Sequence, residues 1–246
     1  TEQRTVWRLV PDWVPGRHRV EVRTRTAELD RLMLELVARA RREDDGHSLL
    51  SRLLAARDED GRAMSDRELR DELVTLFLAG HETTSIALAL ALWLLAEHPD
   101  QWARLVAEPE LAGQAVEETM RHLGAVRGTA RIASEDIVYR DVLFPAGTLV
   151  VTSLATANFD PDAFGDPHRF DIGREPSTAA QMTFGSGIHY CLGASLARAE
   201  LQEALPLLAR RMPDLSLGGP IEWKPLTVGI WGPSRLPLRF TPDVSS

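Results

Sequence analysis

Cys191, the only cysteine of the chain, is the residue most suited to chemistry. It lies in a glycine-rich loop over residues 184–193, Phe-Gly-Ser-Gly-Ile-His-Tyr-Cys-Leu-Gly, and a segment of helical periodicity follows. Backbone amides at a helix N-terminus stabilise a thiolate, the form of cysteine that binds metals. A lone cysteine is more often a small buried apolar residue, so the loop alone leaves a free thiol, a nucleophile and a metal ligand open.

The other residues of this loop suit a flat ligand. Gly185, Gly187 and Gly193 would let the backbone pass close to a planar group and direct amides at the sulfur, while Phe184 would cover it. Groups around a ligating atom control how strongly it binds, so this loop composition favours the metal-ligand interpretation.

A second polar feature interrupts an apolar helical segment at Ala79-Gly80-His81-Glu82-Thr83-Thr84. Glycine inside a helix costs about 1 kcal/mol relative to alanine, and buried polar groups need partners. A functional interpretation is that Gly80 lets the helix approach a planar cofactor. The alternative is a kinked core helix whose threonine hydroxyls bond to carbonyls one turn earlier, and His81 is interpreted as structural.

Two further motifs carry charge. Glu118 and Arg121 are three positions apart, so they share one face of a helix, although most such pairs lie at the surface and contribute little. A Pro-x-Arg-Phe segment follows at residues 167–170, and Arg131 opens the segment Arg-Ile-Ala-Ser-Glu-Asp. A buried glutamate between two guanidinium groups would satisfy both carboxylate oxygens.

These motifs, in this order, resemble those of the cytochrome P-450 family. The loop matches Phe-x-x-Gly-x-x-x-Cys-x-Gly, the helix matches the oxygen-binding motif, and Glu-x-x-Arg and Pro-x-Arg-Phe stand between them. The resemblance extends from about Pro11 to Phe240, and the Leu-Ala-Arg-Ala-Glu after the loop is similar to that of soluble bacterial members.

The resemblance implies a haem b cofactor whose iron is bound by the Cys191 thiolate. It places Arg131 and His189 on the haem propionates, with Arg127 as a competitor for Arg131. The remaining cofactor-binding residues that it implies are Phe184, Gly185, Gly187, Gly193, Ala79 and Gly80.

The same resemblance implies oxygen chemistry at the long helix. Thr83 would hydrogen-bond the dioxygen being activated, and Glu82 would relay protons from solvent. The triad Glu118, Arg121 and Arg169 would be a structural network. The residues implied to face the substrate are Val126, Ile230 and Trp231.

Periodicity and turn signals predict the elements that position these residues. A capping box at Ser65–Glu68 begins a long helix over 65–97 that ends at His98-Pro99, and its apolar composition predicts a core position. Other helices are expected over 26–42, 49–56, 99–108, 111–122 and 192–211. Residues 158–183 should form an irregular meander, and residues 218–240 short hairpins.

The expected fold is mainly α with small β-sheets, as a single domain. Ile137–Tyr139 and Thr148–Val151 flank a Pro145–Gly147 turn and are predicted to pair with each other. The resemblance implies the cytochrome P-450 fold, with the long helix over the haem and the cysteine loop beneath it. Members of the family carry a comparable length of chain before this point, so the N-terminal part of the fold is expected to be absent.

Composition and charge restrict the partners. The chain has 246 residues, 44% hydrophobic and 26% charged, with a formal charge of −8 and no basic stripe, which argues against nucleic acid. The longest apolar run, Ile86 to Ala96, is shorter than a membrane span and is interpreted as a buried helix, and an anchor upstream of this sequence stays open. The resemblance to soluble bacterial members implies a cytoplasmic location. The expected partners are a small organic substrate, a ferredoxin or reductase that supplies electrons, and a missing N-terminal segment or a second chain that completes the fold.

Three functions are considered. The first is a haem-thiolate monooxygenase that uses electrons from a separate partner, because the chain carries no flavin or nicotinamide motif. The second is an enzyme of the same fold that works without external electrons, against which the Glu82-Thr83 pair argues. The third is a truncated, haem-free homologue that acts as a partner or activator, against which the intact Cys191 argues.

Overall fold

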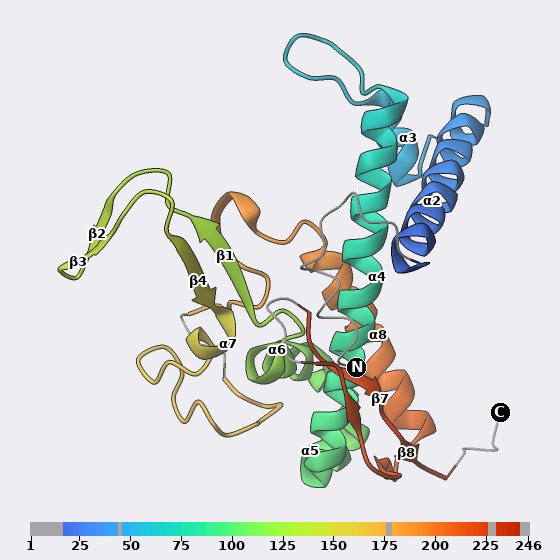
Figure 1. The fold of residues 1–246 in the computed structure, drawn as a ribbon. Helices are drawn as coiled ribbons and strands as arrows, with labels where there is room; N and C mark the ends of the chain where they lie inside the picture. Colours follow the sequence, from blue (N-terminus) through green and yellow to red (C-terminus); the bar gives the residue numbers. More distant parts are fainter. Residues whose placement is uncertain (1–16, 44–45, 176–178, 226–229, 242–246) are drawn as a thin grey trace. The chain divides into compact units, whose positions relative to one another are not determined.

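The computed structural model describes residues 17–43, 46–175, 179–225 and 230–241, and for 17–19 it gives the backbone only. Most of the described residues are helical, and the strands form small two-stranded antiparallel sheets (Figure 1). This confirms the expected fold class. The α-helices are α2 (Arg17–Arg42), α3 (Leu49–Ala55), α4 (Asp66–Glu97), α5 (Pro99–Ala107), α6 (Ala112–Leu123), α7 (Leu154–Ala157) and α8 (Ala194–Arg211). Short 3₁₀ turns occur at η2 (Pro109–Leu111) and η3 (Gly187–His189).

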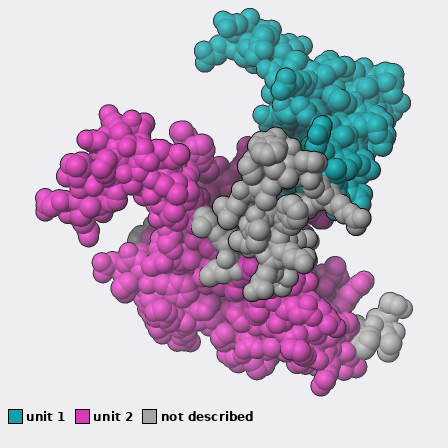
Figure 2. All heavy atoms as spheres, viewed as in Figure 1, with its two compact units in different colours: residues 1–79 teal, residues 80–246 magenta. Residues whose placement is uncertain are grey.

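The chain divides into two compact units, residues 1–79 and 80–246 (Figure 2). In the first unit, α2 begins at Arg17, earlier than the predicted 26, and buries Met33 and Val37 one turn apart. The first part of α4 buries Leu69, and its Arg70 donates to Asp30 of α2 at 2.8 Å. An ion pair therefore joins α2 to α4, and each of the two helices buries apolar side chains.

The long helix begins and ends where the sequence predicts. The Ser65 amide donates to the Glu68 carboxylate at 2.8 Å, and the Glu68 amide donates to the Ser65 hydroxyl at 3.3 Å, which is a complete capping box. The backbone leaves helical geometry at His98, before Pro99.

The prediction that all of α4 lies in the core is wrong for its first half. Phe77 and Leu78 are each more than half exposed, whereas burial is continuous only along one face from Ile86 to Leu95. An apolar helix face is buried only where another element packs on it, and among the described residues burial is continuous along the second half of α4, whereas the first half buries Leu69. By length and composition α4 is also long enough to cross a membrane, a test that core helices of soluble proteins pass as well.

The core of the second unit lies among the end of α4 and helices α5, α6 and α8. Trp102 of α5 and Leu205 of α8 are almost completely buried there, with Val116 of α6. The Trp102 indole N–H donates to the carbonyl of Met212 at 3.0 Å, so its one polar group is satisfied. This core holds α6 and α8 against each other. Glu118 lies on α6, and the cysteine loop leads into α8.

The strand pairing differs from the prediction. β2 (Ile137–Tyr139) pairs with β3 (Val142–Phe144), and β4 (Leu149–Ser153) pairs with β1 (Gly128–Ile132), so the predicted pairing of 137–139 with 148–151 is wrong. Arg140 and Asp141 form the β2–β3 turn with positive φ angles of 47° and 65°. Arg140-Asp141 lacks the glycine that usually marks a two-residue hairpin turn. The Pro145–Gly147 turn is present, but it connects β3 to β4, which do not pair with each other.

The tail forms the predicted hairpins. β5 (Ser216–Leu217) pairs with β8 (Leu238–Arg239), and inside them β6 (Glu222–Trp223) pairs with β7 (Pro233–Arg235). Residues 158–175 and 179–183 contain no helix or strand, as the meander prediction requires.

Candidate functional site

The cysteine loop is closed on itself and presents its thiol to solvent. The Cys191 amide donates to the Phe184 carbonyl at 2.9 Å, and the Cys191 side chain is exposed. Gly185 and Gly187 have φ angles of 73° and 70°, a conformation that side-chain-bearing residues rarely adopt. The glycines are therefore required by the path of the backbone that brings Cys191 to the start of α8.

The surroundings of the thiol suit a large flat apolar ligand. Ile188, three residues before Cys191 in the chain, is 97% exposed, and Leu192, the next residue after it, is 88% exposed. A Cβ atom added at Gly187 or Gly193 would meet no atom within 4 Å, so the space beside the loop is open. Large apolar side chains left exposed in the same short loop as a reactive thiol favour a binding surface. The donor set fits haem, which needs only one axial ligand from this loop.

The polar residues of the long helix lie in a continuous α-helix. α4 passes through Gly80 without a break, so the predicted interruption is confined to the side chains. Glu82 is exposed, and its carboxylate accepts from the Lys224 ammonium at 2.5 Å. Thr83 is half-buried. Ala79 belongs to the first unit, and its part in a cofactor site stays a prediction.

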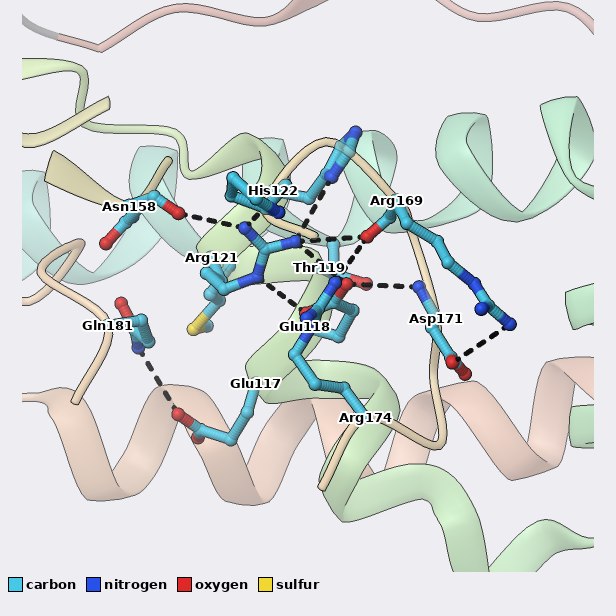
Figure 3. Close-up of polar contacts among 12 residues, drawn as sticks. Glu117, Glu118, Thr119, Arg121, His122, Asn158, Arg169, Asp171, Arg174 and Gln181 are labelled. Carbon is cyan, nitrogen blue, oxygen red and sulfur yellow. Dashed lines mark hydrogen bonds and ion pairs between the residues drawn. The ribbon is translucent and has the colours of Figure 1, made fainter. Parts of the chain in front are cut away.

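Glu118 forms the centre of a buried charge network (Figure 3). Arg121 donates to both Glu118 oxygens, at 2.7 and 2.9 Å, and both side chains are only 2% exposed. The predicted pair is therefore present and buried. Arg121 also donates to the carbonyls of Asn158 and Pro167 at 2.8 Å, so the pair attaches α6 to the irregular segment.

The prediction that the Arg169 side chain completes this network is wrong. Arg174 donates to Glu118 at 3.0 Å, whereas the Arg169 side chain is 65% exposed and pairs with Asp171 (Figure 3). Only the backbone of Arg169 belongs to the network, because its carbonyl accepts from Arg121 and Arg174.

Gly173, next to Arg174, packs closely against the Arg104 side chain. A Cβ at this position would lie 2.3 Å from the Arg104 guanidinium. Asn158, which no sequence signal identified, also holds the irregular segment in place. It is 1% exposed, accepts from the Met182 amide at 2.6 Å and donates to Thr183 at 3.1 Å, just before the cysteine loop.

His122 lies beside this network. Its ring contacts those of Phe159 and Phe170, with centroids 5.3 and 5.5 Å apart. Burial, and secondly the charge of Arg121, lowers the pKa of His122 to about 4. This histidine is therefore neutral at neutral pH.

The predicted substrate-facing residues are brought together. Val126 forms a β-bridge with Ile230, and the Trp231 amide donates to the Ala125 carbonyl at 2.9 Å. The Arg127 guanidinium lies over the Trp231 ring at 5.5 Å.

Of the two residues predicted to bind propionates, Arg131 lies exposed on β1, where its side chain donates to the Ala130 carbonyl. His189 is exposed in η3. Their roles toward a propionate stay predictions.

Comparisons with known proteins identify relatives over most of the chain. The cytochrome P450 family model matches residues 2–212. The chain is 42% identical over 226 residues to nocardicin C N-oxygenase of Nocardia uniformis subsp. tsuyamanensis, covering 90% of this chain and 56% of that protein. It is 40% identical over 224 residues to the cytochrome P450 monooxygenase PikC of Streptomyces venezuelae, covering 89% and 53%.

A solved structure agrees with these relatives. Cytochrome P450 CYP109Q5 from Chondromyces apiculatus superposes with a TM-score of 0.85 at 35% identity, covering 92% of this chain and 57% of that one. The chain thus spans about half the length of the curated relatives that it matches. Because the family model covers most of the chain, and identity and fold agree with it, the chain belongs to the cytochrome P450 family.

Proposed function

We propose that this chain is the haem-binding, oxygen-activating part of a bacterial P450 monooxygenase. One observation carries the proposal: the loop at 184–193 holds an exposed Cys191 thiol on a backbone that requires glycine, between exposed apolar side chains. A thiolate in such a place is an axial haem ligand that increases electron density at the iron.

The residues that would hold haem b are those of the cysteine loop and two cations. Cys191 would bind the iron, Phe184 would cover the sulfur, and Arg131 and His189 would pair with the propionates. Gly80, which has no atom within 4 Å of its would-be Cβ, would leave room for the porphyrin beside α4. When bound, haem supplies the redox centre at which dioxygen is activated.

The remaining steps fall to side chains of α4. The Thr83 hydroxyl would orient the oxygen substrate by a hydrogen bond, and the Glu82 carboxylate would take protons from solvent and pass them inward. The exposed position of Glu82 supports this role, because a group that collects protons must contact water. Lys224 pairs with Glu82 and thus holds the carboxylate in one place.

The substrate is proposed to be a small organic molecule, and the electrons to come from a separate ferredoxin or reductase. The names of the relatives support the reaction type, since they are an N-oxygenase and a monooxygenase. Val126, Ile230 and Trp231 are proposed to line the substrate site. A cytoplasmic location is proposed on the likeness to bacterial relatives and on the burial of the second half of α4.

A carbon monoxide difference spectrum of the reduced, haem-loaded chain tests the proposal. Thiolate-ligated haem gives the red-shifted band of this family, so wild type should show it and Cys191→Ser should lose it entirely. Ser186→Ala is the matched control, because Ser186 lies exposed in the same loop and makes no side-chain cap bond, and it should keep the band. Absence of the band in wild type supplied with haem would instead support the haem-free partner function.

A further inference from the structure

One guanidinium contacts both arms of the cysteine loop. Arg198, in the second turn of α8, donates to the Tyr190 hydroxyl at 3.2 Å, and its Cζ lies 4.4 Å from the centre of the Phe184 ring. Phe184 begins the loop, and Tyr190 immediately precedes Cys191. A planar guanidinium combines these contacts because it stacks on one ring while its edge donates hydrogen bonds.

The opposite edge of the Arg198 guanidinium is held by α6. Glu117 accepts from Arg198 through both carboxylate oxygens, at 2.5 and 3.2 Å, which is the bidentate geometry. This bond to Glu117 raises the pKa of Arg198 still further above its usual range, so its charge is permanent. The two helices that pack in the core thus meet at Arg198.

Glu117 also anchors the chain that enters the loop. Gln181 donates to Glu117 at 3.3 Å and accepts from the Thr183 amide at 2.7 Å (Figure 3). Thr183 in turn donates to the Met120 carbonyl of α6 at 2.6 Å. The segment before Phe184, the Phe184 ring and the Tyr190 hydroxyl are therefore all fixed to α6 and α8.

We propose that Arg198, clamped by Glu117, is a positioning residue that sets the place of the Cys191 thiol by holding Phe184 and Tyr190. The expected effect on iron ligation by Cys191 rests on the proposed function, whereas the expected effect on the position of the loop does not. Lysine keeps the positive charge but lacks the planar guanidinium that donates two parallel hydrogen bonds and stacks on a ring. Arg198→Lys therefore tests the guanidinium geometry while the charge stays the same.

Hydrogen–deuterium exchange of the haem-free chain tests the loop directly. Arg198→Lys should speed exchange of the hydrogen-bonded amides of the loop, those of Gly185, Tyr190 and Cys191, about tenfold, the effect expected from losing a charge-assisted hydrogen bond. Exchange in the buried turns of α6 and α8 should not change. Glu117→Gln should also speed exchange of the loop amides. It provides a second test if Arg198→Lys folds poorly.

Arg210→Lys is the matched control, because Arg210 is an exposed arginine of the same helix and should leave loop exchange as in wild type. Unchanged loop exchange in Arg198→Lys and Glu117→Gln, or equal acceleration throughout the chain, would overturn the proposal.

The haem-loaded chain supplies a second readout. In Arg198→Lys a larger share of the bound haem should lack the red-shifted carbon monoxide band, at equal haem content, because a misplaced sulfur ligates less often. The full wild-type share of this band, with loop exchange accelerated, would overturn the link from clamp to ligand. If the wild-type chain lacks the band, the proposed function is wrong. The exchange experiment on the haem-free chain still tests whether Arg198 and Glu117 position the loop.

Discussion

Glu118 is a buried charge on which the irregular segment depends. Its two oxygens accept from Arg121, from Arg174 and from the Asp171 amide. Burying a carboxylate costs several kcal/mol unless its partners are well placed, so loss of one partner leaves an uncompensated charge. These contacts connect α6 to residues 165–174 and thus support the chain that leads to the cysteine loop.

Arg174 and Arg169, the observed and the predicted third members of the Glu118 network, should differ sharply in their effect on stability. Arg174→Ala removes a guanidinium that is 18% exposed and bonded to Glu118, and should lower the free energy of unfolding by about 3 kcal/mol or more. Arg169→Ala removes only an exposed pair with Asp171 and should cost less than about 1 kcal/mol. Urea denaturation of both variants measures the difference, and equal losses would contradict the assignment of Arg174.

The sequence sufficed for the pair but not for its third member. Glu118 and Arg121 are three apart on a helix, so local geometry alone brings them together. Arg174 lies 56 residues from Glu118 in the chain, so their contact depends on the tertiary path of the irregular segment. Asn158 likewise gains its role from a long-range fold, and a single asparagine in a loop carries no signal for it.

At the scale of elements, start and stop signals predict α4 well, whereas its burial is not predictable from its own residues. The capping box and His98-Pro99 act within one turn of the chain. Which half of an apolar helix is buried depends on what packs against it. The β2–β3 hairpin was not predicted for a different reason: its turn residues, Arg140 and Asp141, adopt positive φ angles although the turn contains no glycine.

Gly80 gives a prediction in which stability and function separate. Since a Cβ at Gly80 meets nothing within 4 Å, Gly80→Ala should stabilise the haem-free chain by about 0.5–1 kcal/mol through helix propensity. The same methyl group should weaken haem binding if Gly80 gives the porphyrin room. Gly113→Ala, within α6 and with only a 3.7 Å neighbour, is the control that should stabilise without affecting haem.

Urea denaturation and haem titration of both glycine variants make the comparison. Unweakened haem binding in Gly80→Ala would reject the cofactor role of this glycine, while leaving its helix-propensity effect intact.

At the scale of the whole molecule, the positioning machinery belongs to one compact unit. Cys191, Glu118 and Arg198, with their described partners, all lie within residues 80–246, where α4, α5, α6 and α8 share a core. His122 lies where α6 meets the irregular segment, between Arg121 and two phenylalanine rings. Its protonation state therefore reports on the folding of that unit.

The lowered pKa of His122 predicts a loss of stability in mild acid. The folded chain resists protonation until about pH 4, whereas the unfolded chain takes up the proton near the ordinary value of 6.5. Acid therefore favours the unfolded state: stability is unaffected above about pH 7 and falls as the pH drops from 6.5 toward 4. Allowing for partial solvent screening, the loss is about 1–2 kcal/mol.

His122→Gln isolates this contribution, because glutamine carries no titratable group and every other titratable group of the chain is unchanged. Urea denaturation at pH 7.5 and pH 5 should show a smaller decrease in the variant than in wild type. Equal decreases in the two proteins would mean that the buried ring does not resist protonation, and that its position between Arg121 and the phenylalanine rings does not couple folding to pH.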